Sequence, residues 1–401
     1  MSRSMSALAA GAVLAGLVTA TAPASAAPAS YAVAAPTGTP TVASAAATAT
    51  ACVPDAVRLP ALPSGPWTSG AVNGLGADGL AVGESRGLPA YWTADRTVHP
   101  VPLPAGFQNG SVTAVNAKGL MVGTLERSSD RAHAAFTYRA GDAAVRLLTG
   151  ASAGTGAGDV NDAGRVVGMD AGTPKEWANG TVVRELPVPE DAHPGTRIVT
   201  VDGINKRGDV LGTAHTEYED PENDRIVSKT FPVVWPAGGG YPPYSLPVWN
   251  ETDWTTGTEA SGIDDKGRVV GYEAENYREL RRRTPAVWKK PYDAPPAAPG
   301  PVTGYETLTF EAISPTTNVT VGAAATFVEG YARYVRAAYW PGTGSPLVLP
   351  NPAGASADVN TEARAVSDDD RVGGSFRDLL TLTDSAMIWT CASKQAYAPE
   401  K

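Results

Sequence analysis

The 401-residue sequence has few residues of the kinds that carry nucleophilic or metal chemistry. It contains two cysteines and four histidines, and His99, His133, His193 and His215 show no paired ligand spacing. Two cysteines are too few for a disulfide-rich scaffold or a four-cysteine zinc site. No G-x-S-x-G nucleophile elbow occurs. These absences leave little support for nucleophilic or zinc-dependent catalysis.

Positive charge is also scarce. The chain has 32 Lys and Arg against 41 Asp and Glu, which gives a formal net charge of -9 and a pI near 5.1. A nucleic-acid partner requires a basic stripe that neutralises phosphates, so none is predicted. The one basic run, from Arg278 to Lys290, shares its loop with Glu273, Glu275 and Glu279 and is interpreted as a solvated hairpin.

Long apolar runs are confined to the N-terminus. Residues 1–26 are typical of a secretory signal peptide, with an early Arg3, an apolar stretch from Ala7 to Val18 and an Ala-Ser-Ala cleavage site at 24–26. The stretch is too short for a membrane span, and the sequence offers no second candidate. Residues 27–50 are uncharged and rich in Ala, Thr and Pro, which predicts a flexible spacer. We therefore expect a secreted, extracellular protein without a transmembrane segment.

What the chain has in abundance is glycine, 43 residues in all, and the glycines recur in a repeated motif. Its clearest copy, at 160–168, is Val-Asn-Asp-Ala-Gly-Arg-Val-Val-Gly. Close copies occupy 115–123, 204–212 and 263–271, and weaker ones 75–83, 313–322 and 366–374. Each copy predicts a tight hairpin, because Asn or Asp caps a turn, Gly accepts a positive φ, and a β-branched strand follows.

An aromatic strand and then an apolar strand follow each copy. The aromatic residues are Trp92, Tyr138, Trp177, Trp235, Trp288, Trp340 and Trp389. The apolar strands are assigned to Leu103-Pro104, Leu148, Leu186-Pro187, Leu246-Pro247, Leu308 and Leu349-Pro350. Four short strands per unit, at a period of about 40 to 60 residues, are typical of propeller blades. The sequence predicts an all-β fold, a seven-bladed β-propeller of four-stranded antiparallel blades.

The seventh unit lacks an apolar strand after Trp389, and a spare copy stands at Val57-Arg58-Leu59-Pro60. We expect this N-terminal strand to complete the last blade, because closure removes an open sheet edge. Cys52 and Cys391 flank the two partners and are predicted to form a disulfide; the alternative is two unrelated buried thiols. The propeller is placed at 51–393, with a C-terminal tail at 394–401.

The turns of the motif are short and uniform, so the face that carries them is interpreted as structural. The opposite face carries irregular, acidic loops, where sites are commonly found. The ligand-binding candidates there are Glu217, Glu219, Asp220, Glu222, Asp224, Trp249, Asp253, Trp254 and Glu273. Carboxylates beside tryptophans suit a sugar, and equally suit Ca²⁺, although no EF-hand spacing occurs. Alternatively, the acids are solvated and the tryptophans cover the hydrophobic edge of a blade.

A second candidate site is the channel along the ring axis. The residue before each repeated apolar position is small in six of the seven units, as expected where inner strands crowd the axis. Asp159 is the exception. Together with Asp202, Glu311 and Arg364 it is predicted to line a charged channel.

The repeat Ile/Val-Asn-x-x-Gly-x-Val-Val-Gly, followed by an Ala-aromatic strand such as His133-Ala134-Ala135-Phe136-Thr137-Tyr138, resembles the bacterial extracellular repeats called the HAF family. The resemblance covers nearly all of 66–391. In most units Pro-Ala-x-Trp or Ala-x-Trp replaces the His-Ala-Phe element. The resemblance implies export from a bacterium and a repeat-built β fold. It implies no catalytic residue, because the family carries no established activity.

Two hypotheses of function follow. The first is a secreted, monomeric binding module that recognises a carbohydrate, peptide or protein on the irregular face. The second is a secreted polysaccharide hydrolase or lyase that uses paired carboxylates there, since glycoside hydrolysis needs two facing acids. A purely structural role is a third alternative. No cofactor is expected, and bound Ca²⁺ is left open by the acidic loops.

Overall fold

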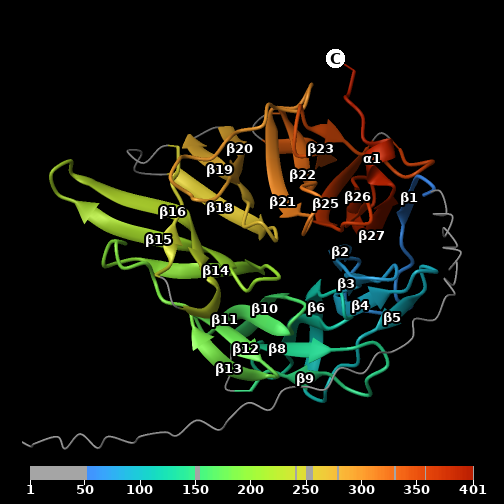
Figure 1. Ribbon diagram of the computed structural model, residues 1–401. Helices are drawn as coiled ribbons and strands as arrows, with labels where there is room; N and C mark the ends of the chain where they lie inside the picture. Colours follow the sequence, from blue (N-terminus) through green and yellow to red (C-terminus); the bar gives the residue numbers. More distant parts are fainter. Residues whose placement is uncertain are drawn as a thin grey trace, which may run out of the picture. The chain divides into compact units, whose positions relative to one another are not determined.

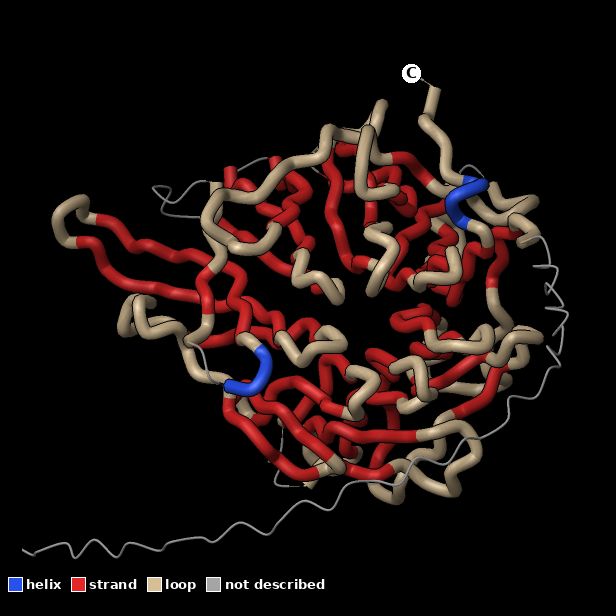
Figure 2. The backbone as a smooth tube through the Cα atoms, viewed as in Figure 1, coloured by secondary structure: helices blue, strands red, loops and turns tan. Residues whose placement is uncertain are grey.

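The computed structural model describes residues 52–149, 154–239, 242–249, 256–277, 280–328, 331–356 and 358–400. Residues 51–401 form one compact unit. Its described residues are almost entirely β-strand and turn (Figure 2), with one short helix, α1 (Ala392–Gln395), and one 3-10 turn, η1 (Ala237–Gly239). Within these ranges no helix has the length and apolar character needed to cross a membrane.

The strands form seven blades that follow one another around an axis in chain order (Figure 1). Blade 1 consists of β2 (Gly70–Leu75), β3 (Ala81–Ser85), β4 (Leu88–Trp92) and β5 (Val98–Pro100). Blade 2 consists of β6 (Phe107–Val115), β7 (Met121–Arg127), β8 (His133–Tyr138) and β9 (Arg146–Leu147). Blade 3 consists of β10 (Thr155–Val160), β11 (Arg165–Asp170), β12 (Thr173–Ala178) and β13 (Thr181–Glu185). In each blade every strand is antiparallel to the next.

Blades 4 to 7 repeat this order with longer strands. Blade 4 consists of β14 (Arg197–Ile204), β15 (Val210–Asp220), β16 (Arg225–Trp235) and β17 (Tyr244–Ser245), and blade 5 of β18 (Thr256–Ile263), β19 (Val269–Tyr277) and β20 (Leu280–Trp288). Blade 6 consists of β21 (Thr307–Ile313), β22 (Thr320–Val328), β23 (Tyr331–Trp340) and β24 (Leu347–Val348). Blade 7 consists of β25 (Val359–Val366), β26 (Arg371–Asp378), β27 (Thr383–Thr390) and β1 (Asp55–Arg58). A bridge between Thr230 and Gly257 joins blades 4 and 5 into one sheet. The predicted seven-bladed propeller is confirmed.

The motif asparagine holds both its own turn and the next blade. In blade 3, Asn161 Oδ1 accepts hydrogen bonds from the main-chain nitrogens of Ala163 and Arg165, both at 3.1 Å. Its Nδ2 donates to the main-chain oxygen of Asn205 in blade 4, at 3.1 Å. Asn116 and Asn205 donate to the next blade in the same way. The three motif asparagines therefore link blade 2 to blade 3, blade 3 to blade 4 and blade 4 to blade 5.

The glycine that closes each motif is required by a close approach. A Cβ at Gly168 would lie 2.1 Å from the main-chain oxygen of Gly156 on the inner strand, and the equivalent glycines of the other blades are as crowded. One or two residues before the turn, every inner strand contains a β-bulge, as between Ala157 and Asp159. The residue directly after the bulge is small in six of the seven blades, because neighbouring inner strands meet there; a Cβ at Gly262 would lie 3.2 Å from Ile313.

Hydrophobic clusters fill the spaces between all neighbouring blades. The predicted aromatic residues lie on the third strands, and five of their tryptophans are almost fully buried. Four indole nitrogens donate to the proline oxygen that ends the preceding blade: Trp92 to Pro60, Trp235 to Pro187, Trp288 to Pro247 and Trp389 to Pro350, at 2.7 to 2.8 Å. The Leu-Pro sequence thus provides an acceptor for the next blade's tryptophan.

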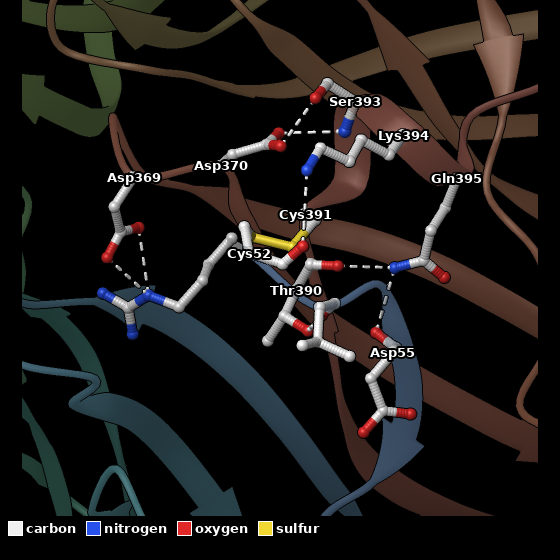
Figure 3. Close-up of a disulfide and its surroundings, with 11 residues drawn as sticks. Cys52, Asp55, Asp369, Asp370, Thr390, Cys391, Ser393, Lys394 and Gln395 are labelled. Carbon is white, nitrogen blue, oxygen red and sulfur yellow. Dashed lines mark hydrogen bonds and ion pairs between the residues drawn. A yellow bond between two sulfur atoms is a disulfide. The ribbon is translucent and has the colours of Figure 1, made fainter. Parts of the chain in front are cut away.

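The ring closes as the sequence predicts. Strand β1 pairs with β27, with Val57 opposite Ile388, and a disulfide joins Cys52 to Cys391 with a Cα–Cα distance of 5.8 Å. Figure 3 shows that residues of α1 contact both partners of this junction. Lys394 Nζ donates to the Cys52 oxygen at 3.3 Å, and the Gln395 side chain donates to the Asp55 oxygen at 3.0 Å and to the Thr390 oxygen at 2.6 Å.

Arg371 forms the corresponding link from blade 7 to blade 1. Blade 1 has Gly76 at the motif asparagine's position, and the guanidinium of Arg371 donates to the main-chain oxygens of Gly76 and Leu80. Asp369 accepts from the same guanidinium at 2.8 Å (Figure 3). A charged side chain therefore replaces the amide at the closing junction.

Two assignments of the outer strands were wrong. Leu308 lies in β21, the inner strand of blade 6, and the outer edge of blade 5 is an isolated bridge between Val287 and Ala297. A long link between these blades displaced the spacing on which the assignment depended. In blade 1, Val101 rather than Leu103 occupies the position after the outer strand, and its nitrogen donates to the Pro89 oxygen.

Candidate functional site

An axial cavity of about 730 Å³ lies inside the ring of motif turns. Residues from all seven blades line it, at the ends of the inner strands and in the turns that follow. Asp159, Asp202, Glu311 and Arg364 all line this cavity. The structure thus brings together the four residues predicted for the channel.

Asp159 is placed by the bulge of β10. Its Oδ1 accepts from the Val160 nitrogen at 2.7 Å, and its Oδ2 accepts from the Ile204 nitrogen of blade 4 at 2.9 Å. Desolvation outweighs these bonds and raises the pKa of Asp159 to about 6. Asp159, the one residue that is not small at its position in the inner strands, therefore links blade 3 to blade 4 and also places a carboxyl group at the axial cavity.

Asp202 lies on β14, one blade further round the cavity. Its Oδ2 accepts from the Thr200 hydroxyl at 2.8 Å and from the Thr213 hydroxyl at 3.4 Å. Desolvation raises the pKa of Asp202 to about 7, and the negative charge of Glu259 on blade 5 adds to the effect. Glu259 itself accepts from the Tyr272 hydroxyl at 2.5 Å.

Glu311 and Arg364 extend the charged lining to blades 6 and 7. Burial raises the pKa of Glu311, and the charges of Arg283 and Arg364 partly oppose this. Arg364 forms an ion pair of 3.1 Å with Glu362. In all, eight acidic and three basic residues line the cavity, so its field favours cations.

The sequence analysis missed the acids of the turns. Asp162, Asp265 and Asp368 follow the motif asparagine position and line the cavity. Each accepts from a main-chain nitrogen of the preceding blade: Ala117, Lys206 and Thr316, at 2.9 to 3.0 Å. Their recurrence directly after that position was the available signal. They combine a structural role with negative charge at the cavity.

The acids predicted for the irregular face are spread out. Glu217, Glu219, Glu222 and Asp224 are exposed along the hairpin of β15 and β16, which projects from blade 4 (Figure 1). Asp220 pairs with Arg225 at 3.1 Å and accepts from the Asn223 side chain at 2.8 Å, within the same hairpin. These contacts stabilise the tip of the hairpin.

The remaining candidates of that face divide between the core and undescribed positions. Trp249 is half-buried and packs against the hydrophobic cluster of blades 4 and 5. Glu273 is only 2% exposed, on β19 opposite Thr258 and Thr284. Asp253 and Trp254 lie outside the described residues.

The described part of the chain contains no group of three or more His, Cys, Asp or Glu side chains that could hold a metal ion. The question of bound Ca²⁺ therefore gains no geometric support from these residues. The candidate chemistry of the axial cavity is that of hydrogen bonding and charge.

No protein-family model and no curated protein sequence matches the chain, so the HAF resemblance stays a prediction. Among solved structures, the chain is similar to virginiamycin B lyase from Staphylococcus aureus, at 8% identity and a TM-score of 0.48, over 84% of this chain and 99% of that one.

It is also similar to the β-propeller domain of the Trilobed protease from Pyrococcus furiosus, at 7% identity and a TM-score of 0.47, over 77% and 89% of the two chains. The Dos1 propeller is similar at 9% identity and a TM-score of 0.42, over 83% and 85%. No activity, ligand or residue role is taken from these proteins.

Proposed function

We propose that the chain is an exported binding propeller whose axial cavity takes a ligand with a cationic group, an ammonium or a guanidinium. The observation that carries this proposal is one cavity of about 730 Å³ that Asp159, Asp202 and Glu311 line from blades 3, 4 and 6. Export rests on the predicted signal peptide at 1–26.

The composition of the cavity lining supports this class of ligand. Among the described residues that line the cavity there is no Trp, Tyr or Phe, so these offer no ring for stacking. Main-chain groups of the turns, carboxylates and threonine hydroxyls provide hydrogen-bond acceptors, and the acidic excess attracts positive charge. A guanidinium presents several donors to such a surface.

Titration calorimetry with an N-acetylated, C-amidated tri-arginine peptide and with spermidine tests the proposal. At pH 8 we expect binding of at least one probe, and Asp202→Asn and Glu311→Gln should each weaken it about fivefold to tenfold, or about 1 to 1.4 kcal/mol. Glu222→Gln removes the same charge from the exposed hairpin and is the matched control. Absence of binding by both probes, or equal effects of all three substitutions, would refute the proposal.

The hydrolase or lyase hypothesis is the second candidate. It is favoured by one observation: an acid with a pKa of about 7, Asp202, interacts with the carboxylate of Glu259. A general acid with a pKa near the operating pH and a second carboxylate are the elements of glycoside hydrolysis. Shortened products from a soluble polysaccharide, lost in Asp202→Asn, would establish it over simple binding.

A further inference from the structure

A second, smaller cavity lies between blades 7 and 1, toward the opposite ends of the inner strands from the motif turns. Its volume is about 150 Å³. Its polar lining includes Ser69, Glu84, Glu362, Arg364, Arg377 and Asp384. Arg364 also lines the axial cavity, and the other five do not. We call this cavity the junction cleft.

Two polar groups of the junction cleft lack partners. Glu84, on β3, is half-buried. Its side chain makes no hydrogen bond or ion pair among the described residues. The hydroxyl oxygen of Ser69 is buried and likewise has no partner within the described chain. Buried polar atoms normally find hydrogen-bond partners. Both groups are therefore available to a ligand.

The arginines of the cleft are paired, but loosely. Arg377 Nε lies 3.6 Å from Asp384 Oδ1, and a guanidinium nitrogen of Arg364 lies 3.1 Å from Glu362 Oε2. All four side chains are more than a third exposed. The cleft thus offers carboxylate acceptors and guanidinium donors side by side. A molecule rich in hydroxyl groups satisfies both, because each hydroxyl donates once and accepts twice.

Trp67 stands beside this cleft and is unlike the other tryptophans. Of the eight tryptophans that the structure describes, it alone is exposed, at 50%. The main-chain nitrogen of Trp67 donates to the main-chain oxygen of Arg86 at 3.3 Å. The main-chain nitrogen of Arg86 in turn donates to the main-chain oxygen of Ser69 at 2.6 Å. Ser69 is two residues away, or roughly 7 Å along an extended chain.

The indole of Trp67 is held in position by the turn between β3 and β4. A Cβ at Gly87 would lie 2.4 Å from the six-membered ring of the indole, and the φ of Gly87 is 77°. The ring therefore rests on a backbone that only glycine provides, while half of its surface stays exposed to solvent. A fixed and exposed indole of this kind offers a flat apolar surface on which a ligand can stack.

Two exposed leucines continue the apolar surface. Leu380 and Leu382, at 73% and 65% exposure, form the turn between β26 and β27 of blade 7. The Asp384 nitrogen donates to the Thr68 oxygen at 3.0 Å, which places this turn next to Trp67 in space. An apolar surface with a polar cleft at its side results.

We propose that Trp67 and the junction cleft form a binding site for a neutral saccharide. A sugar ring has an apolar face, which stacks on an exposed indole, and a rim of hydroxyls, which the cleft can bind. The cleft volume equals that of roughly five water molecules, so it accepts the hydroxyls of one sugar unit rather than a chain. The site is separate from the axial cavity, and the proposal does not depend on the cationic ligand.

Electrophoresis of the folded mature protein in native gels that contain dextran, mannan, xylan or pectin tests this site. We expect retardation by at least one of the three neutral polysaccharides. Trp67→Ala should weaken the affinity at least tenfold, Trp67→Phe should retain part of it, and Glu84→Gln should weaken it threefold to tenfold. Tyr334→Ala removes an aromatic side chain of similar exposure on blade 6 and should change nothing.

Thermal unfolding of each variant establishes that it is folded before its affinity is compared. Migration unchanged by all four polymers, or retardation by pectin alone, overturns the assignment of a neutral saccharide. Retardation that persists in both Trp67→Ala and Glu84→Gln overturns the location. Because neither residue lines the axial cavity, tri-arginine binding by these variants shows separately whether the proposed function holds.

Discussion

The indole nitrogen of Trp389 donates a hydrogen bond of 2.8 Å to the main-chain oxygen of Pro350, and so joins blade 7 to the end of blade 6. The same bond recurs at three other junctions. At the junction of blades 2 and 3 the equivalent tryptophan, Trp177, is buried without a hydrogen-bond partner among the described residues. Trp389 and Trp177 can therefore be compared to measure how much the indole hydrogen bond contributes to stability.

Trp389→Phe should destabilise the protein more than Trp177→Phe. Both substitutions remove similar volume from a fully buried position, but only the first leaves the Pro350 oxygen without its donor. We expect a difference in the free energy of unfolding of about 1 to 2 kcal/mol, measured by denaturant titration. Equal losses would show that the bond to Pro350 contributes nothing to stability.

The amide donor of Asn161 should be required between blades 3 and 4. Asn161→Asp keeps the two hydrogen bonds that the side chain accepts and removes the one that it donates to Asn205. We expect a loss of about 1 to 3 kcal/mol, since a buried oxygen loses its partner beside a new charge. Asn179→Asp, in the exposed turn between β12 and β13 of the same blade, is the control, and a loss as large there would contradict the account.

Loss of the disulfide should open the ring at blade 7. Cys52 and Cys391 are 339 residues apart, and the chain-entropy model gives about 6 kcal/mol for closing so long a loop. Cys52→Ser with Cys391→Ser should lower the free energy of unfolding by about 2 to 5 kcal/mol. The double substitution should reduce the protection of the β1 amides from hydrogen exchange more than it reduces that of the β4 amides. Unchanged protection of β1 would show that strand pairing alone holds the junction.

Asp202→Asn should stabilise the protein at high pH. The folded state raises the pKa of Asp202 from 3.8 to about 7, so it binds the proton more tightly than the unfolded chain does. Stability therefore falls as the pH rises through that window, and the substitution removes this loss. We expect the unfolding midpoint of the variant to exceed that of the wild type by roughly 2 to 4 °C at pH 8, with no difference near pH 4.

Asp224→Asn is the control for this measurement, because Asp224 is exposed at the hairpin tip. Its midpoint should follow that of the wild type at every pH. An advantage of Asp202→Asn that grows as the pH falls would contradict the proposed desolvation of the carboxyl.

The fold was predictable because its signals are local. The motif glycines, the third-strand tryptophans and the spare Leu59-Pro60 each act within a few residues or repeat at a fixed position, and the ring follows from counting them. Leu308 was misassigned because a long link between blades 5 and 6 carries no comparable signal. Spacing predicts strands only where links are short.

The sites were predictable in part. Asp159 stood out because it broke a rule of small residues, and the structure explains it by the bond to Ile204. The cavity that Glu84 shares with Arg377 and Asp384 was not predictable, because it depends on the packing of blade 7 against blade 1 across the closure. The acids of the long hairpin were prominent in the sequence, yet they lie exposed along a hairpin that projects from blade 4 rather than around a cavity.

The most direct test of the axial site is the pH dependence of tri-arginine binding, measured by titration calorimetry at pH 5.5 and pH 8. The guanidinium groups stay charged at both values, whereas Asp159 and Asp202, with pKa values of about 6 and about 7, lose charge at the lower one. We predict an affinity about tenfold higher at pH 8 for the wild type and a smaller change for Asp202→Asn. An affinity that is equal at the two pH values, or higher at pH 5.5, would contradict the account.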